Sequence, residues 1–290
     1  MKVYLTSALI ALVSVLAAGC SAPPLPSATD TATATPSATG DPTPTLPSPS
    51  PTLPSPFARP EWLGTIPLEL HADGSTISAP TPPELTERAL EPRPFFVDPV
   101  SDEFTAHVSG VPSYVAARST YVDGCPVPLE DLRYITLTFW GFDGRPHVGE
   151  IIVHRSVADD VVEVFHELYD ARFPIEEMRV VSLADLQGPA TGDGNGSGAF
   201  SCRKIVGSVS TWSQHSYGLA IDINPFQNPY VKGEVIIPEL AGSYLDREWE
   251  RPGMIERGDI VVRAFARIGW TWGGTWSSPK DYMHFSLTGR

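Results

Sequence analysis

Apolar residues beyond about residue 104 recur at the spacings of short strands and helices. The run Leu132–Phe142 is rich in β-branched and aromatic side chains, and Gly149–His154 is a second apolar run. Both runs predict strands, which a turn at Asp143–Pro146 would join. From Val157 to Arg172 the apolar residues follow helical spacing, so we expect a helix there that ends before Pro174.

The second half of the chain gives shorter signals. The predicted elements are a strand at Met178–Leu183, a loop with alternate glycines at Gly192–Gly198, a strand at Ala220–Ile223, a helix at Ile260–Ile268, and strand or loop at Trp270–Gly274 and Met283–Leu287. Strands and helices that mix without strict alternation favour an α+β domain, with a central antiparallel sheet and flanking helices.

The first twenty residues predict an export signal. Lys2 supplies a positive charge, Leu9–Leu16 is an apolar run, and small residues lead to Gly19 and Cys20. The run is shorter than the roughly 20 apolar residues that span a bilayer. A cysteine at this place resembles the cleavage site of bacterial lipoproteins, in which the thiol is lipidated and becomes the mature N-terminus. We therefore expect an extracytoplasmic protein with a lipid anchor on Cys20. An ordinary signal peptide is the alternative.

Composition divides the rest of the chain into three parts. Residues 21–57 are rich in Pro, Ser, Thr and Ala and offer too little apolar surface to offset the entropy of ordering, so we expect a disordered, extended stalk. Residues 58–103 mix aromatic residues with proline pairs and predict an extended lead-in. Residues 104–290 then form the folded domain, which we expect to be a monomer.

The net charge bears on the kind of binding partner, and the cysteine content bears on whether a disulfide forms. The formal net charge is −14, from 34 acidic and 20 basic residues, which argues against a nucleic-acid partner because phosphate-binding surfaces need an excess of Lys and Arg. Apart from Cys20, the chain contains only Cys125 and Cys202. Export would place them where disulfides persist, so we expect a bridge between them. Two buried free thiols are the alternative.

One histidine and one aspartate flank a glycine in the segment Ser213–Asp222. A catalytic zinc site uses three nitrogen or carboxylate ligands and leaves a fourth position open for water. A chain reversal at Gly218 would bring His215 beside the strand that carries Asp222. This aspartate lies in an apolar stretch, where a carboxylate is costly to bury unless a cation meets it. The alternatives are a structural histidine and an aspartate that caps a turn.

A second cluster follows at Asp281–Phe285. In an extended strand or a tight turn, His284 can reach a metal while Asp281 stays close enough to take a proton from the water that the metal activates. Asp281 could then pass that proton to the leaving amine. Alternatively, Asp281 caps a turn after Pro279 and His284 packs behind aromatic residues.

The two clusters together resemble a known family. The pattern S-x-H-x-x-G-x-A-x-D, followed by W-G-G-x-W and D-x-x-H-F, is similar to that of the VanY-like D-alanyl-D-alanine carboxypeptidases and the related L-alanyl-D-glutamate endopeptidases. The resemblance covers roughly Gly149–Phe285. It implies a hedgehog/DD-peptidase fold, a Zn²⁺ ion held by His215, Asp222 and His284, Asp281 as the general base, and peptidoglycan stem peptides as substrates.

The resemblance also suggests roles for Ser213 and Arg203. Ser213 matches a position that contacts substrate in the family. Arg203 lies where relatives carry an Asn-Cys-Arg segment, although Ser201 replaces the asparagine here. A guanidinium at this place could bind a substrate carboxylate or stabilise the oxyanion of the tetrahedral intermediate. A weakly paired surface arginine is the alternative.

The remaining aromatic and histidine residues carry no motif of their own. Trp270, Trp272 and Trp276 could line a groove for glycan or peptide, but the first two share one face of a strand, and we expect Trp272 to be structural. His154 and His166 have no partner motif and are expected to be structural too.

The sequence therefore predicts a zinc-dependent cell-wall peptidase, of either the carboxypeptidase or the endopeptidase type. A non-catalytic cell-wall-binding lipoprotein that keeps the peptidase fold is the alternative, although a binding module would not need all three ligands and the acid. A signalling or structural lipoprotein would explain the anchor and the stalk but not the site. The peptide bond that is cut stays open.

Overall fold

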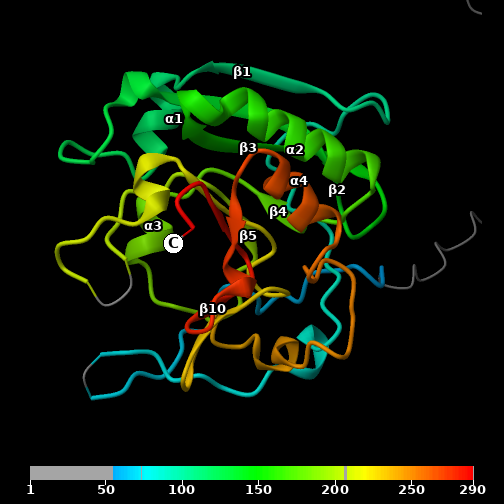
Figure 1. Cartoon of the computed structure of the whole chain (residues 1–290). Coiled ribbons are helices and arrows are strands. Elements are labelled where there is room, and N and C mark those ends of the chain that lie inside the picture. Colours follow the sequence, from blue (N-terminus) through cyan, green and yellow to red (C-terminus); the bar gives the residue numbers. More distant parts are fainter. Residues whose placement is uncertain (1–54, 73, 206–207, 290) are drawn as a thin grey trace, which may run out of the picture. The chain divides into compact units, whose positions relative to one another are not determined.

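The computed structural model describes residues 55–72, 74–205 and 208–289 (Figure 1). The predicted signal peptide, the lipid anchor at Cys20 and nearly all of the predicted stalk lie outside these residues and stay predictions. Across the described part of the chain, no helix combines the length and the apolar character that crossing a bilayer requires.

A long antiparallel hairpin forms the largest sheet. Strand β2 (Leu132–Trp140) pairs with β3 (Pro146–His154), and β1 (Ala106–Gly110) pairs with the other edge of β2. The strands predicted at 132–142 and 149–154 are present, and β3 begins earlier than expected. Seven of the nine residues of β2 are buried, because apolar clusters cover both of its faces. Burial on both faces explains why its sequence is apolar nearly throughout.

Two helices complete the main core. Helix α2 (Ala158–Asp170) packs on β2, and α4 (Ile260–Arg267) packs on α2 (Figure 1). The apolar positions that predicted α2 are all buried: Val161, Val164, Phe165 and Leu168. At the start of α4, the carboxylate of Asp259 accepts a hydrogen bond from the N–H of Val262, and the helix ends before Gly269, whose φ is 80°. Both predicted helices are thus present.

The strand predicted at Met178–Leu183 is wrong beyond its first residue. Strand β4 covers only Glu177–Met178, and α3 (Leu183–Gln187) begins where the strand was expected to end. The hydroxyl of Ser182 accepts a hydrogen bond from the N–H of Asp185, whose carboxylate accepts one from the N–H of Ser182. This capping box starts a helix in place of a longer strand.

Several small sheets replace the single central sheet that the sequence predicted. The shorter strands are β5 (Gly196–Ser197), β6 (Ala220–Asp222), β7 (Tyr230–Lys232), β8 (Val235–Ile237), β9 (Thr271–Trp272), β10 (Lys280–Asp281) and β11 (His284–Ser286). They form two antiparallel sheets, in the orders β6-β11-β9 and β10-β7-β8, and β5 pairs in parallel with β4 inside the predicted glycine loop. Glycine and proline interrupt these segments and keep the strands short. The fold is therefore α+β, with several antiparallel sheets and few helices.

The remaining helices are short. They are α1 (Ser113–Arg118) and the 3-10 helices η1 (Pro83–Leu85), η2 (Leu129–Asp131), η3 (Arg155–Val157), η4 (Gln214–Tyr217), η5 (Gly242–Leu245) and η6 (Gly273–Thr275). Of these, η4 packs against β6 and η6 packs against β11, the two strands that carry predicted metal ligands.

The lead-in segment packs into a second apolar cluster with residues from the C-terminal half of the chain. The cluster consists of Leu63, Leu85, Leu90, Phe226, Leu240, Ala241, Tyr244 and Met254. Beside it, the guanidinium of Arg88 is buried and donates two hydrogen bonds of 2.7 Å to the carboxylate of Glu176. Burial would raise the pKa of Glu176, but the charge and hydrogen bonds of Arg88, together with the charge of Arg59 and a hydrogen bond from Asn195, lower the pKa below the ordinary value. The lead-in thus supplies the counter-charge for a buried acid.

Candidate metal centre

The structure brings the three predicted ligands together. Asp222 ends β6, His284 begins β11, and the two residues are directly paired in the ladder, while His215 lies on η4. The Nδ1 atom of His284 is 3.0 Å from Oδ1 of Asp222, and Nε2 of His215 is 3.1 Å from Oδ2 of the same carboxylate. The two imidazole nitrogens are 3.2 Å apart.

These atoms fit a metal ion. The Nδ1 atom of His215 lies 2.6 Å from the carbonyl oxygen of Ala199. Because a carbonyl oxygen only accepts, Nδ1 carries the proton, and the lone pair on Nε2 is free to bind a metal ion together with the other two ligands. Burial would raise the pKa of Asp222, but His215 and then His284 outweigh it and hold the pKa well below its usual range. An ionised carboxylate and two imidazole nitrogens that face one another match the donor set of catalytic zinc sites.

A tight turn at Gly218 carries the chain from His215 into β6. Gly218 adopts a φ of 67°, in the left-handed region that favours glycine. Its carbonyl accepts a hydrogen bond from the N–H of His154, and a Cβ atom on Gly218 would lie 2.5 Å from that same nitrogen. The predicted reversal is therefore present, and it is held against the end of β3.

Ser213 begins the short helix that carries the first ligand. Its hydroxyl accepts a hydrogen bond of 3.3 Å from the N–H of His215, and Ser213 also lines the pocket described below. Ser213 thus orders the ligand loop and forms part of the pocket wall.

Asp281 lies on β10, directly opposite Tyr230 of β7. Directly opposed residues in an antiparallel pair point to the same face, and here both line one pocket with the three ligands. The Oδ1 atom of Asp281 is buried and has no hydrogen-bond partner among the described residues. Burial, followed by the negative charge of Asp222, raises the pKa of Asp281 to about 7. A carboxyl group with such a pKa can accept and return a proton near neutral pH.

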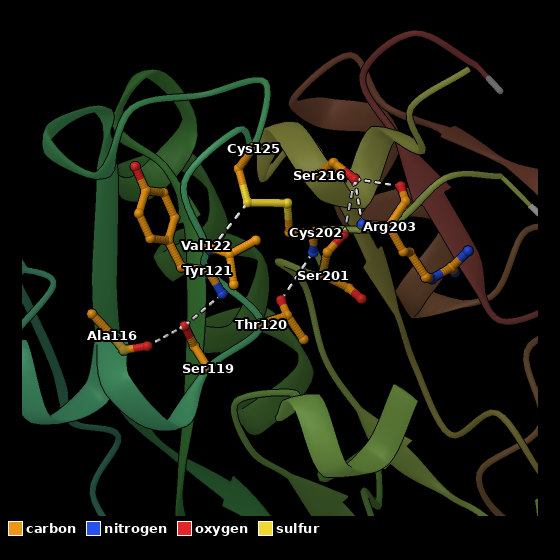
Figure 2. The surroundings of a disulfide bond; sticks show 10 residues. All are labelled: Ala116, Ser119, Thr120, Tyr121, Val122, Cys125, Ser201, Cys202, Arg203 and Ser216. Carbon is orange, nitrogen blue, oxygen red and sulfur yellow. Dashed lines mark hydrogen bonds between the residues drawn. A yellow bond between two sulfur atoms is a disulfide. The ribbon is translucent and has the colours of Figure 1, made fainter. Parts of the chain in front are cut away.

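The predicted disulfide joins Cys125 to Cys202 (Figure 2). The N–H of Cys202 also donates a hydrogen bond of 2.9 Å to the hydroxyl of Thr120. The bridge therefore ties the segment after α1 to the segment that leads into the ligand loop.

The two neighbours of Cys202 hold the ligand loop (Figure 2). The N–H of Ser201 donates to the carbonyl of His215 at 3.1 Å, and the N–H of Arg203 donates to the hydroxyl of Ser216 at 2.9 Å. The side-chain hydroxyl of Ser201 is buried without a partner in the described part of the chain, so it provides no hydrogen bond in place of the asparagine expected there. Arg203 itself lines the pocket.

A pocket of about 500 Å³ lies over the ligands. Besides the ligands, Asp281, Arg203 and Ser213, its lining includes Trp212, Tyr230, Lys232 and Trp276. The ring centroid of Trp276 is 5.6 Å from that of His284. No sequence motif contains Tyr230 or Lys232, and the pairing of β7 with β10 brings their strand to the site.

The other candidate aromatic and histidine residues do not line this pocket. Trp270 and Trp272 are buried in the main core, as expected for Trp272. The ring of His154 accepts a hydrogen bond from the N–H of Ser156, and His166 stacks on Phe104 with 4.6 Å between ring centroids.

Comparison with known proteins agrees with this geometry. Residues 207–287 match a protein-family model described as D-alanyl-D-alanine carboxypeptidase, and the matched segment contains the three predicted ligands and Asp281. No solved structure matches the chain. The family match confirms the resemblance of this chain to the VanY-like D-alanyl-D-alanine carboxypeptidases.

Proposed function

We propose that the chain is a zinc-dependent peptidase of the hedgehog/DD-peptidase fold that hydrolyses amide bonds of peptidoglycan stem peptides. The observation that carries the proposal is the mutual approach of His215, Asp222 and His284 in a pocket that also contains Asp281. The family match supports it, because the matched segment includes all four residues.

The chain's own residues divide the chemistry between them. Zinc bound by the three ligands would polarise the scissile carbonyl and lower the pKa of water to the neutral range. Asp281 accepts the proton of the attacking water on its carboxylate and returns it to the nitrogen of the leaving amine. The hydrogen bond from Nδ1 of His215 to the carbonyl of Ala199 fixes the orientation of the ring, so that Nε2 points to the place where the metal would bind.

Arg203 adds a positive charge to the same pocket. Its N–H groups would donate to the oxyanion that develops on the carbonyl, or to a carboxylate of the substrate. These two roles separate in kinetics. If Arg203 donates to the oxyanion, Arg203→Ala should lower kcat. If Arg203 binds a carboxylate of the substrate, the same variant should raise KM.

Replacement of Asp281 by asparagine tests the mechanism. We expect Asp281→Asn to bind zinc as the wild type does and to lose about 10²–10⁴-fold in kcat, because the proton acceptor is gone while the ligands remain. Zinc content is measured by elemental analysis, and turnover is measured on purified muropeptides. Asp123→Asn, at an exposed position that lines neither the pocket nor the ligand loop, is the matched control. Full turnover in Asp281→Asn would refute the assignment of the base.

The products decide which bond is cut. We would incubate the protein with muropeptides, with and without a chelator, and identify the products by mass spectrometry. Release of D-Ala indicates a carboxypeptidase, and new L-Ala or D-Glu ends indicate an endopeptidase. If no product depends on zinc, the proposed zinc-dependent hydrolysis is wrong, and the result favours the non-catalytic wall-binding role.

We further propose that the protein is exported and held at the membrane by a lipid on Cys20, as its N-terminal sequence predicts. Replacement of Cys20 by serine should move the protein from the membrane fraction to the soluble fraction. An unchanged distribution would contradict the anchor.

A further inference from the structure

A second pocket, of about 560 Å³, adjoins the metal centre. It shares Arg203, Asp222, Ile237 and Met283 with the first pocket, so the cavity continues past the ligands. One of its walls comes from the lead-in, through Arg59, Leu63, Gly64, Arg88 and Arg93. A peptide that reaches the metal from this side must therefore pass residues that lie outside the segment matched by the family model.

The floor of this second pocket has room for a peptide backbone. It is formed by a glycine-rich loop between α3 and β5. A Cβ atom on Gly194 would have no neighbour within 4 Å, and one on Gly196 would have only a carboxylate oxygen of Glu177 at 3.9 Å. Gly194 and Gly196 thus leave open space beside the backbone in the pocket lining, which allows close approach of a bound chain.

The acidic side chains of this pocket already have donors. Asp193 accepts from the N–H of Gly64 at 2.6 Å and from the hydroxyl of Thr191 at 2.6 Å. Glu239 accepts from the hydroxyl of Thr76 at 2.5 Å. Asp185 and Glu177 are both paired with Arg179, the former at 2.7 Å, and Asp222 belongs to the metal centre. The carboxylates of these acids therefore already have hydrogen-bond or ion-pair partners within the protein.

Two of the five arginines in the lining do not form an ion pair at hydrogen-bond distance within the described residues. Arg59, Arg88 and Arg179 each form an ion pair at hydrogen-bond distance. By contrast, the nearest carboxylate oxygen to Arg93, on Glu177, is 3.8 Å from its Nε atom, and nearly half of the Arg93 side chain is exposed (47%). The guanidinium of Arg203 has one long hydrogen bond, of 3.4 Å, to a backbone carbonyl and no ion pair within the described residues.

We propose that this second pocket is a subsite for an acidic residue of the substrate, and that Arg93 of the lead-in binds its carboxylate. The inference rests on the proposed peptidase function and deepens it. Where the acids are satisfied and two guanidinium groups keep free N–H donors, the ligand that completes the hydrogen bonding is an anion. A stem peptide with a free carboxylate near the scissile bond supplies that anion, and the planar guanidinium can hold it through two parallel hydrogen bonds.

The test compares two synthetic stem peptides that differ only in whether the acidic residue carries a free carboxylate or its amide. Purified full chain with Arg93→Glu should lose about tenfold in kcat/KM on the carboxylate peptide, as expected for a lost hydrogen bond to a charged group. Its kcat/KM on the amide peptide should stay near that of the wild type. Arg93→Lys keeps the charge but cannot form the two parallel hydrogen bonds, so its preference should fall between those of the wild type and Arg93→Glu. Arg257→Glu, at an exposed position that lines neither pocket, should behave as the wild type does.

Failure of this inference and failure of the proposed function give different results. If Arg93→Glu and Arg257→Glu cleave both peptides with the same preference, the subsite is wrong while the peptidase function stands. If the wild type cleaves neither peptide, the peptidase function fails, and calorimetric binding of the same two peptides decides the subsite. Weaker binding of the carboxylate peptide to Arg93→Glu than to Arg257→Glu supports it, and equal affinities overturn it.

Discussion

Removal of the disulfide between Cys125 and Cys202 should destabilise the fold strongly. The bridge closes a loop between residues 77 positions apart, and this loop includes the hairpin β2–β3 and helix α2. Without the bridge, the unfolded chain gains the freedom of that loop, whereas the folded chain keeps its other contacts. The perturbation is the double replacement Cys125→Ser and Cys202→Ser, which leaves no free thiol at either position.

The loop length sets the expected magnitude. In the chain-entropy treatment, closing a loop of 77 residues removes about 15 cal/mol/K from the unfolded state, which is about 4.5 kcal/mol at 25 °C. Single domains are stable by only about 5–15 kcal/mol, so this loss is a large fraction of the total. The double variant should still fold, but its denaturation midpoint should fall well below that of the wild type.

Chemical denaturation measures the effect. Unfolding in urea, followed by tryptophan fluorescence and extrapolated linearly to water, gives the free energy of unfolding for wild type and variant. Reduced wild type should unfold at nearly the midpoint of the double variant, and thiol titration verifies that two thiols were released. Reductant added to the double variant is the control and should change nothing. A loss below about 1 kcal/mol with complete reduction would refute loop closure as the source of stability.

Two further substitutions test the packing around the ligand loop and the main sheet. Gly218→Ala should destabilise the protein by about 1–3 kcal/mol and weaken zinc binding, because its φ of 67° disfavours a side chain and the new Cβ would meet the backbone nitrogen of His154. Thermal stability and zinc affinity equal to those of the wild type would contradict this. Burial would raise the pKa of Glu150, but hydrogen bonds from Arg118 and Tyr134 outweigh it and lower the pKa below the ordinary 4.5. The ionised carboxylate therefore stabilises the fold above pH 4.5 and less so as the pH falls through the lowered value, so the stability difference between wild type and Glu150→Gln, from urea midpoints, should shrink on acidification. A difference that stays constant from neutral to acid pH would contradict that assignment.

The parts of the fold that the sequence predicted are those with strong local signals. The hairpin and α2 follow from long runs with a clear period, and the reversal at Gly218 follows from a residue that tolerates positive φ. The helix at Leu183 was missed because it is only five residues long and is started by one capping box, which is a weaker signal than a long periodic pattern. The strand predicted at Ala220–Ile223 is present as β6, and β9 and β11 lie where strand or loop was expected. Strands β5, β7, β8 and β10 were not predicted, because strands of two or three residues carry no period of their own.

The candidate site divides in the same way. The ligands and Asp281 lie in two short motifs, and pairing of β6 with β11 brings those motifs together. Tyr230 reaches the site only through the register of β7 and β10, and Arg93 only through the path of the lead-in. Such placements depend on tertiary contacts, which a single sequence does not encode in any local pattern.

The buried pair of Arg88 and Glu176 determines where the chain can be shortened. A fragment that began at Phe104, where the apolar periodicity starts, would keep the acid in the interior and discard its cation. Removal of one partner from a buried ion pair costs about 3–5 kcal/mol. The same cut would also strip Leu63, Leu85 and Leu90 from the second apolar cluster. Truncation and limited proteolysis should therefore yield a stable product only when the cut falls before Arg59, within the proline-rich segment, and not when it falls at Phe104.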